Sequence, residues 1–312
     1  MVVEGQYVGN HWENMMFEAD VNQLPANELG CPSSPATPDL CRPFPQYTGI
    51  GVGAGGSRTG LYKGVSNYEA VQGLLHKPFG NGLSAELAYT WSRLKDDMDT
   101  SGWGNQFGGV FYQDAYNPHA NYGLSNFDRP HAFKATAVYA LPLGKGHQYL
   151  NSAAADAALG GWQASLTFQA ESGAPFTVWL DPSADGSLCN TAQGGCALYP
   201  NLTGNPHVSN QSISQWFNPA AFAIPSANTF GSNKRNSLRG PKLTDLDFSL
   251  GKTWGLPGWE QGKLGLRMDA TNILNHPSFQ NPDGKLTDSS VGTITGTTIG
   301  GRVLQLAARF SF

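Results

Sequence analysis

The four cysteines carry the most reactive side chains in this sequence. Cys31 lies close to Cys41 in the chain, and Cys189 lies close to Cys196. Pairs of this kind form disulfides in oxidising compartments. A zinc site is the alternative, but the sequence has no C-x2-C spacing and no paired histidines nearby, as structural zinc sites require. The spacing therefore favours two local disulfides over a metal centre.

Two glycine-containing segments share residue types with nucleotide-binding loops. The segment 49–56 is rich in glycine, but a dinucleotide fingerprint needs a strand before it and a helix after it, and no amphipathic helix follows. Gly251-Lys252-Thr253 matches the end of a P-loop, yet the first glycine of that motif would have to stand at Leu246. We expect a flexible loop at 49–56 and a strand through Gly251. Since G-x-S-x-G and H-E-x-x-H motifs are also absent, we expect no enzymatic activity and no cofactor.

Composition indicates a membrane protein that crosses the bilayer with strands. Charged residues make up 13% of the 312 residues, about half the usual share. Hydrophobic residues make up 40%, yet no run approaches the ~18 apolar residues of a membrane-spanning helix. Only helices and closed barrels satisfy every backbone group in lipid. The net charge of −4 gives no basic surface for nucleic acid.

The amino terminus has no basic n-region and no apolar h-region, so Met1-Val2-Val3-Glu4-Gly5 does not resemble a signal peptide. We expect an exported chain with this start to begin partway through a longer protein.

Apolar and polar residues alternate over eight segments of about ten residues. We expect strands at 2–10, 67–77, 83–92, 131–141, 161–171, 245–254, 262–273 and 302–312. In the last segment Leu306 falls on one face and Arg309 on the other. About ten residues let a tilted strand cross a bilayer, whereas soluble strands usually have about five or six. The alternation is too weak to assign faces at 2–10 and 67–77.

The links between these segments alternate in length. Short links are expected at 78–82, 142–160 and 255–261, and long links at 11–66, 93–130, 172–242 and 274–301. Outer-membrane barrels have short periplasmic turns and long extracellular loops. Counting back from Phe312 at the periplasmic end assigns every short link to the periplasm. The pattern predicts an all-β fold, an antiparallel transmembrane β-barrel segment in the outer membrane that occupies residues 1–312.

Aromatic residues on the expected lipid-facing side gather near strand ends. Those at the periplasmic ends are Tyr139, Trp162, Trp254, Phe310 and Phe312, and those at the opposite end are Tyr89 and Trp91. Barrels carry aromatic girdles at both interfaces because amphipathic rings suit the headgroup boundary. A soluble sandwich would bury such rings in its core without collecting them at strand ends.

Charged residues fall on the opposite, inner face of the same segments. They are Glu86, Lys134, Glu171, Asp245, Asp247, Arg267, Asp269 and Arg309. Asp245 and Asp247 have the residue types of a catalytic carboxylate pair. We favour a structural role, because barrel interiors are polar and line a wet or plugged lumen.

The long links contain aromatic residues with two alternative roles. They are Trp103, Phe107, Phe111, Tyr112, Tyr116 and Tyr122. Loops on a rigid scaffold carry recognition, so these rings could bind a ligand. They could equally pack the loop against itself, and the sequence leaves both interpretations open.

Several phrases of the sequence resemble TonB-dependent receptors of the Oar-like kind. They are Asn67-Tyr68-Glu69-Ala70-Val71-Gln72, Ala88-Tyr89-Thr90-Trp91-Ser92, Ser125-Asn126-Phe127-Asp128-Arg129-Pro130-His131, Gly160-Gly161-Trp162, Ser172-Gly173-Ala174-Pro175-Phe176-Thr177, Asn236-Ser237-Leu238-Arg239-Gly240-Pro241 and Asn272-Ile273-Leu274-Asn275-His276-Pro277, with a terminal Phe312. The resemblance covers nearly the whole chain, in order. The signal peptide, regulatory sandwich domain, TonB box and plug domain of such receptors are not visible here.

The resemblance implies a fragment of a transporter. Barrels of this kind have about 22 strands, so these eight would be the last third. The implied partners are outer-membrane lipid, a plug domain, the remaining strands and, indirectly, the TonB complex, and the implied function is uptake of a nutrient that the sequence does not name. Two alternatives remain open: a self-contained small barrel with a structural or adhesive role, and a soluble extracellular β-sandwich that binds carbohydrate.

Overall fold

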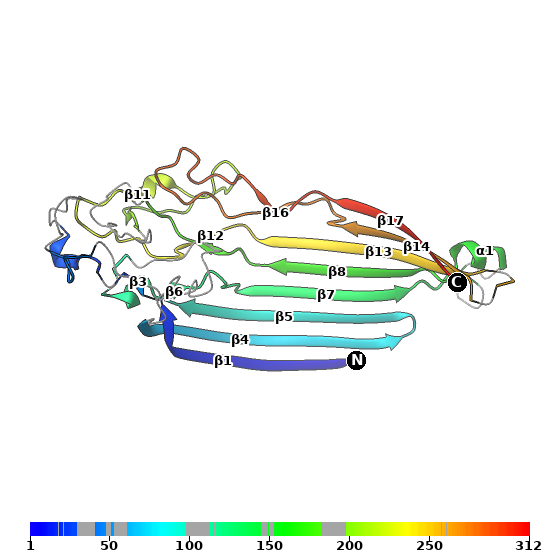
Figure 1. The fold of residues 1–312 in the computed structure, drawn as a ribbon. Helices are drawn as coiled ribbons and strands as arrows, with labels where there is room; N and C mark the ends of the chain where they lie inside the picture. Colours follow the sequence, from blue (N-terminus) through cyan, green and yellow to red (C-terminus); the bar gives the residue numbers. More distant parts are fainter. Residues whose placement is uncertain are drawn as a thin grey trace.

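The alternating segments form one long antiparallel sheet, as the computed structural model shows (Figure 1). The structure describes residues 1–17, 19–20, 22–29, 41–47, 51–52, 61–97, 113–114, 116–144, 149, 153–181, 198–256, 258–259 and 261–312. The sheet order is β1-β4-β5-β7-β8-β13-β14-β17, so strands that follow one another in the sheet follow one another along the chain. The all-β antiparallel fold predicted from the sequence is confirmed.

Each predicted strand corresponds to one strand of this sheet. They are β1 (Val2–Phe17), β4 (Leu61–Gly80), β5 (Leu83–Asp96), β7 (His131–Ala140), β8 (Gln163–Glu171), β13 (Leu243–Gly255), β14 (Lys263–Thr271) and β17 (Val303–Ser311). Hydrophobic alternation located six of them through one clearly apolar face, and the weaker patterns at 2–10 and 67–77 still marked β1 and β4.

The first three strands extend well beyond their predicted ends. β1 continues to Phe17 and β5 to Asp96, while β4 begins at Leu61. In β1 the register shifts between Trp12 and Met15, and Asn14 between them has φ 57°. An irregularity of this kind breaks strict alternation, so the sequence pattern gave no sign that the strand continued.

The turn between β4 and β5 is a two-residue hairpin. Asn81 and Gly82 have φ values of 53° and 80°, and Gly80 pairs with Leu83 across the turn. Positive φ at both central residues is the type I′ arrangement that Asn-Gly favours, and it matches the twist of the flanking strands. The link predicted at 78–82 therefore shortens to two residues.

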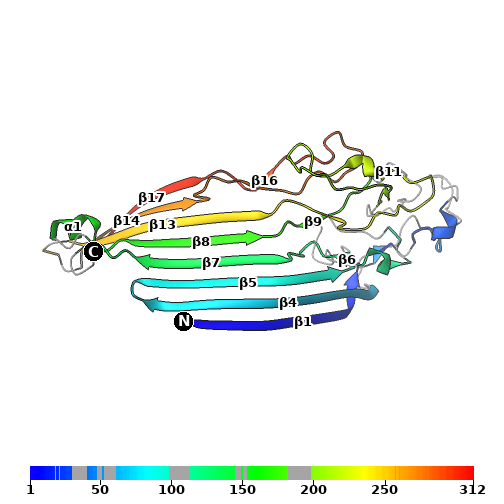
Figure 2. The ribbon, with the colours of Figure 1, turned by 180° about the vertical axis from the view of Figure 1, so that it is seen from behind.

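The long and short links lie at opposite ends of the sheet (Figure 2). The β4–β5 turn, helix α1 (Ala153–Leu159) and the carboxyl terminus lie at one end, and the long links lie at the other. The alternation of link lengths thus corresponds to two physical ends, the short-link end and the loop end. Helix α1 was not predicted, because 142–160 was assigned only as a short link.

The long links contain short elements of their own. They are the strand pairs β2 (Ala19–Asp20) with β3 (Gly51–Val52), β9 (Pro175–Phe176) with β12 (Leu238–Arg239), β10 (Asn201–Leu202) with β11 (Phe222–Ala223) and β15 (Ser278–Phe279) with β16 (Thr297–Ile299), strand β6 (Gly123–Leu124) beside β5, and 3-10 helices at Ala26–Glu28, Pro118–Asn121 and Pro219–Ala221. No helix in the described part of the chain is long and apolar enough to span a membrane.

The hydrophobic core lies among the long links rather than on the sheet. Among the described residues, Ala70 and Ala270 are the only buried apolar residues of the eight long strands. One cluster forms around Phe217, whose ring centroid lies 5.7 Å from that of Phe176 and 5.9 Å from that of Phe222. A second cluster joins Leu24, Leu29, Leu180 and Leu198. Within the described residues, no continuous protein layer therefore covers either face of the sheet.

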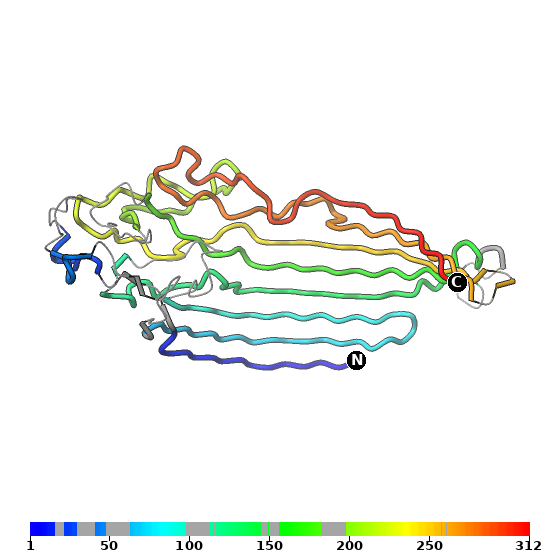
Figure 3. Tube along the Cα trace, in the orientation of Figure 1, coloured from blue at the N-terminus to red at the C-terminus, as the bar shows by residue number. Residues whose placement is uncertain are grey.

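The sheet does not close on itself. β1 and β17 lie at its opposite edges, as the trace in Figure 3 shows, and neither pairs with the other within the described residues. Val303, Leu304 and Leu306 of β17 are 61%, 61% and 81% exposed. Two strand edges thus carry unpaired backbone groups.

Candidate functional site

The strand register gives the sheet two chemically distinct faces. Cross-strand partners point to the same side of a sheet, and neighbours along a strand alternate. Leu264 pairs with Phe310 and Trp254, whereas Arg267 pairs with Ala307 and Gly251. Following these pairs through the sheet keeps the apolar positions predicted for six of the strands on one side, and the same pairs assign faces to β1 and β4, which the sequence had left open. We call the two sides the apolar face and the polar face.

The apolar face carries the aromatic residues predicted as a membrane girdle. At the short-link end, Trp162 and Trp254 pack edge to face with ring centroids 6.0 Å apart, and Tyr139 pairs with Leu83. Phe310 lies 5.9 Å from Phe312, again between centroids. That this face contacts lipid stays a prediction.

Tyr89 and Trp91 were expected at the end of their strand, and this expectation is wrong. Trp91 pairs with His131, the first residue of β7, but β5 continues to Asp96. Beyond Trp91 the same side carries Arg93, paired with Glu69, so apolar character ends between Trp91 and Arg93. From Leu83 to Trp91 the strand rises about 26 Å at ~3.3 Å per residue, or roughly 20 Å along the normal at ~40° tilt. This approaches the ~25 Å apolar band of outer-membrane barrels.

The polar face gathers the eight charged residues that the sequence placed together. The register puts Glu86, Lys134, Glu171, Asp245, Asp247, Arg267, Asp269 and Arg309 on this side. Several form exposed ion pairs: Lys134 Nζ lies 3.9 Å from Glu171 Oε1, and Arg267 Nε lies 2.8 Å from Asp269 Oδ1. Exposed pairs contribute little to stability, which is the behaviour expected of side chains that line a wet interior.

The paired aspartates of β13 differ in their hydrogen-bond partners. Asp247 Oδ1 accepts the backbone N–H of Asn272 at 2.9 Å, which fixes it at the end of β14. Asp245 Oδ1 is buried without a hydrogen-bond partner within the described residues. The described part of the chain contains no cluster of three or more His, Cys, Asp or Glu able to hold a metal ion.

A cleft of about 310 Å³ opens on the polar face toward the loop end. Its walls combine aromatic rings, hydroxyl and amide groups, and charges of both signs, from Tyr68, Gln72, Thr90, Phe127, Arg129, Lys134 and Glu171 among others. Burial lowers the pKa of Arg129 below its ordinary range, and the nearby Glu171 carboxylate opposes this effect. The cleft can therefore make polar contacts with a molecule or domain that lies against the polar face.

Segments far apart in sequence converge at the loop end through Asp128. This carboxylate is fully buried and forms an ion pair with Arg239. It also accepts the backbone N–H of Leu94 at 2.6 Å, while Arg239 donates to the carbonyl of Gly173 at 3.2 Å. Charge-assisted bonds are the stronger class of hydrogen bond. Three of the phrases that carry the family resemblance therefore meet at one place.

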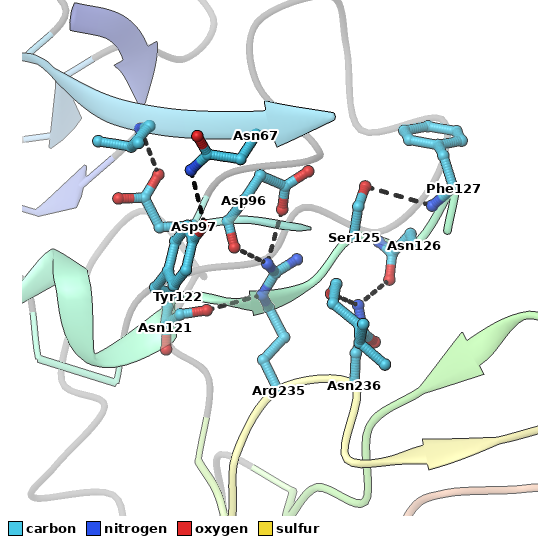
Figure 4. A network of polar contacts seen from close by, with 12 residues as sticks. Asn67, Asp96, Asp97, Asn121, Tyr122, Ser125, Asn126, Phe127, Arg235 and Asn236 are labelled. Carbon is cyan, nitrogen blue, oxygen red and sulfur yellow. Dashed lines mark hydrogen bonds and ion pairs between the residues drawn. The ribbon is translucent and has the colours of Figure 1, made fainter. Parts of the chain in front are cut away.

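A second set of polar contacts at the loop end includes Asp96, Asn121, Asn126, Arg235 and Asn236 (Figure 4). Arg235 is 3% exposed and donates to the Asp96 carboxylate at 2.6 Å and to the Asn121 carbonyl at 3.2 Å. Asn236 donates to the Leu124 carbonyl at 2.7 Å and to Asn126 at 2.9 Å. Because low dielectric strengthens such bonds, the network fixes the long links against the ends of β4 and β5. We call the contacts around Asp128 and around Arg235 together the rim network.

Asp97 belongs to the rim network and has a perturbed acidity. Its Oδ1 accepts the Val65 N–H at 2.8 Å, and its Oδ2 lies 3.2 Å from His119 Nδ1. Burial raises the pKa of this carboxyl above its ordinary value of 3.8, and the Val65 N–H and the His119 ring partly offset the rise.

The long links are also tied to one another. Gln113 accepts the backbone N–H of Tyr199 at 3.1 Å and donates to the Gly231 carbonyl at 3.1 Å, and Gln23 donates to the Gln113 carbonyl at 2.7 Å. The backbone carbonyl of Trp179 accepts the backbone N–H of Leu286 at 2.8 Å. Described residues of all four long links are thus joined by hydrogen bonds at the loop end, and we call them the loop assembly.

Two of the predicted loop aromatics form hydrogen bonds through their hydroxyl groups at the loop end. Tyr116 donates to the Gln23 carbonyl at 2.7 Å, and the hydroxyl of Tyr122 accepts from Asn67 at 2.6 Å. Trp103, Phe107, Phe111 and Tyr112 lie outside the described residues. Both rings remain exposed, Tyr116 at 49% and Tyr122 at 37%, so ligand binding and packing of the loop both stay open for the six rings.

Of the four cysteines, Cys41 lies within the described residues, and it is disulfide-bonded. Cys31, Cys189 and Cys196 lie outside them, so the two proposed pairings stay predictions. The segment 49–56 lies outside too, apart from β3. Gly251-Lys252-Thr253 is part of β13, as expected.

Comparison with known proteins identifies the class of the sheet. A family model described as an outer membrane beta barrel domain matches residues 1–305. The chain belongs to this family. It is an outer-membrane protein, as predicted from composition and link lengths. The soluble sandwich alternative is wrong, because the long strands form one sheet with no second large sheet packed on it within the described residues.

Among solved structures, the outer membrane transporter YddB from Escherichia coli is similar to this chain. The match has 10% sequence identity and a TM-score of 0.48, and it covers 99% of this chain but 30% of the transporter. No curated protein matches the chain.

Sequence reasoning missed most of the rim network. Asp96, Asp97 and Arg235 stand in segments without periodicity, so no pattern marked them as buried. Asp128 and Arg239 belong to phrases of the family resemblance, which was the one available sign that they matter.

Proposed function

We propose that this chain is the C-terminal barrel portion of a TonB-dependent outer-membrane receptor of the Oar-like kind. It would take up an unidentified nutrient with energy coupled from the inner membrane, and it would act without catalysis. The sequence resemblance motivates this proposal, and the family of outer-membrane barrel domains is compatible with it.

The free edges of β1 and β17 are the observation that carries the proposal. An outer-membrane strand has no water to satisfy its backbone, and each unpaired group in hydrocarbon costs several kcal/mol, on the order of a lost buried hydrogen bond. These two edges lie on opposite sides of the sheet. In a membrane both edges need strand partners, and in the proposed receptor the remaining strands of the larger barrel would be those partners.

The polar face and the loop assembly support a receptor role. In the proposed wide barrel the polar face would enclose a plug domain, and its charges and the cleft near Arg129 would contact that plug. The loop assembly is tied by the rim network, so it would present a fixed surface over the outer opening. The other proposed partners are outer-membrane lipid and, indirectly, the TonB complex.

The second candidate is a self-contained barrel of eight strands with a structural or adhesive role. Eight strands are about enough to close a narrow barrel whose side chains fill it. β1 and β17 run in opposite directions, so they have the relative orientation needed to pair directly.

Cysteine cross-linking in native outer membranes separates the two candidates. Gln6→Cys is combined in turn with Gln305→Cys, Ala307→Cys and Arg309→Cys. Arg267→Cys with Ala307→Cys is the positive control, because these residues are register partners. The proposal predicts cross-linking in the control alone. Bridging between β1 and β17 would establish the small closed barrel instead.

Energy coupling is tested by growth. Strains that lack this receptor or lack TonB are compared on siderophore, cobalamin, saccharide and peptide sources, each at a limiting concentration. The proposal predicts a defect on the same source in both strains. A defect caused by loss of the receptor but not by loss of TonB would refute the coupling.

A further inference from the structure

Helix α1 lies against the apolar face of the sheet at its short-link end. The contacts come from Lys252 and Trp254 of β13 and from Trp162 just before β8. All three side chains stand on the apolar face, because they alternate with polar-face residues such as Gly251 and Gln163. The helix is therefore outside the sheet, on the side that the proposed orientation turns toward lipid.

The sheet supplies hydrogen bonds to the last carbonyls of the helix. Lys252 Nζ donates to the Asp156 carbonyl at 3.0 Å and to the Ala157 carbonyl at 2.8 Å. Trp254 Nε1 also donates to the Ala157 carbonyl, at 2.7 Å, and Trp162 Nε1 donates to that of Ala158 at 3.0 Å. The Asp156 carbonyl also accepts the Gly160 N–H at 3.0 Å. The last carbonyls of a helix have no partner within it, so the donors to Ala157 and Ala158 cap α1 from outside.

Without the helix, the ammonium of Lys252 would stand on the apolar face without these carbonyl partners. It is 7% exposed, and it faces the same way as Leu250 and Trp254. Its ammonium lies 4.8 Å from the centre of the Trp254 ring, which is a favourable cation–π distance. The negative end of the helix dipole also favours a cation here. The helix thus gives a lysine on the apolar face a set of partners that lipid could not provide.

The outer surface of α1 has the chemistry of a membrane interface. Ala157, Ala158 and Leu159 are exposed, and Leu159 is 44% exposed. Asp156 packs inward, since a side chain added at Gly144 or Gly160 would lie 2.2 Å from its Oδ1. Small apolar residues beside tryptophans suit the boundary between headgroups and acyl chains.

We infer that α1 is an interfacial helix that contacts phospholipids of the periplasmic leaflet and is held in place by Lys252. This inference rests on the proposed orientation of the apolar face. The tight β4–β5 turn lies at the same end without such a helix, so α1 extends the lipid-contacting surface of the sheet locally, between β7 and β13.

Spin labels test the inference in the full-length receptor, reconstituted in phosphatidylethanolamine and phosphatidylglycerol. Labels are placed singly through Leu159→Cys, Leu306→Cys on the apolar face and Ile224→Cys at the loop end, after showing that unsubstituted protein takes no label. We expect the ratio of oxygen to nickel-chelate collisions at 159 to resemble that at 306 and to exceed that at 224.

Lys252→Met is then combined with the label at 159, with Lys252→Arg as the matched control that keeps a donor. We expect the methionine variant to lose the lipid-like collision ratio and the arginine variant to keep it. A lipid-like ratio in the methionine variant would show that Lys252 does not hold the helix. A water-like ratio at 159 with a lipid-like ratio at 306 would refute the inference alone. Water-like ratios at both positions would overturn the proposed orientation and the inference with it.

Discussion

Arg235 and Asp96 lie 139 residues apart in sequence, and their side chains are joined at 2.6 Å from Nη2 to Oδ1. Both side chains are almost completely buried. Arg235 belongs to the link between β8 and β13, and Asp96 is the last residue of β5. This pair therefore fixes a long link against a strand that is not its sequence neighbour, at the end of the sheet where the loop assembly begins.

Removing Arg235 should loosen the loop end. Arg235→Ala leaves the Asp96 carboxylate buried without its ion pair, and breaking a buried pair in this way costs about 3–5 kcal/mol. We expect faster hydrogen exchange in peptides that cover 118–128 and 233–241. Lys234→Ala is the control, because Lys234 is exposed and adjacent. Equal exchange in the two variants would show that the pair does not hold the link.

The β4–β5 turn should tolerate little change at Gly82. A Cβ there would lie 2.9 Å from the Ala140 carbonyl oxygen, and φ is 80°. Gly82→Ala should therefore destabilise the hairpin by about 1–2 kcal/mol and lower the fraction of heat-resistant folded barrel. Gly73→Ala in β4 meets nothing within 4 Å and should fold normally. A Gly82→Ala barrel that folds as well as Gly73→Ala would contradict the assigned turn.

Asp97 should make the loop end less stable as pH rises. Burial raises its pKa above 3.8, so the folded state binds the proton more tightly than the unfolded state. The stability linked to this group is complete below 3.8 and is lost as pH rises through the folded pKa. The Val65 amide, corrected for intrinsic exchange, should be better protected at about pH 4 than at about pH 7.

Asp97→Asn should remove this pH dependence, because the amide oxygen still accepts the Val65 N–H but carries no charge to desolvate. An asparagine variant with the same slope as the wild type would assign the pH effect to another group.

The cysteine pairings can be read by alkylation. If Cys189 is bridged to Cys196, alkylation of the denatured, unreduced protein should leave both residues unlabelled. The same result is expected for Cys31 and Cys41 if they are paired. The closed loops are short, so the expected stability effect is modest. Labelling of Cys189 and Cys196 without reductant would refute their pairing.

The strands were predictable because each has a period of two over a long segment. Leu264, Leu266 and Met268 alternate with polar residues, and the structure pairs each with an apolar partner on β17 or β13. The sequence also separated the two ends, since short and long links alternate along the chain.

The loop assembly was not predictable in the same way. Arg235 and Asp128 are charged residues in aperiodic segments, and their burial depends on contacts with residues more than a hundred positions away. Helix α1 was missed because its seven residues are too short to show a helical period, and most of its stabilising donors come from β13. Tertiary contacts of this kind leave no local signal.

The facing of the last strand tests the central claim most directly. Leu306, 81% exposed, is assigned to lipid and Arg309 to the interior. An arginine facing lipid near the midplane costs ~2–4 kcal/mol, and a one-residue register error would exchange the two faces. In the full-length receptor we predict that Leu306→Arg sharply reduces the heat-resistant assembled barrel, whereas Arg309→Leu assembles nearly normally. Normal assembly of Leu306→Arg together with failure of Arg309→Leu would contradict the orientation of the whole sheet.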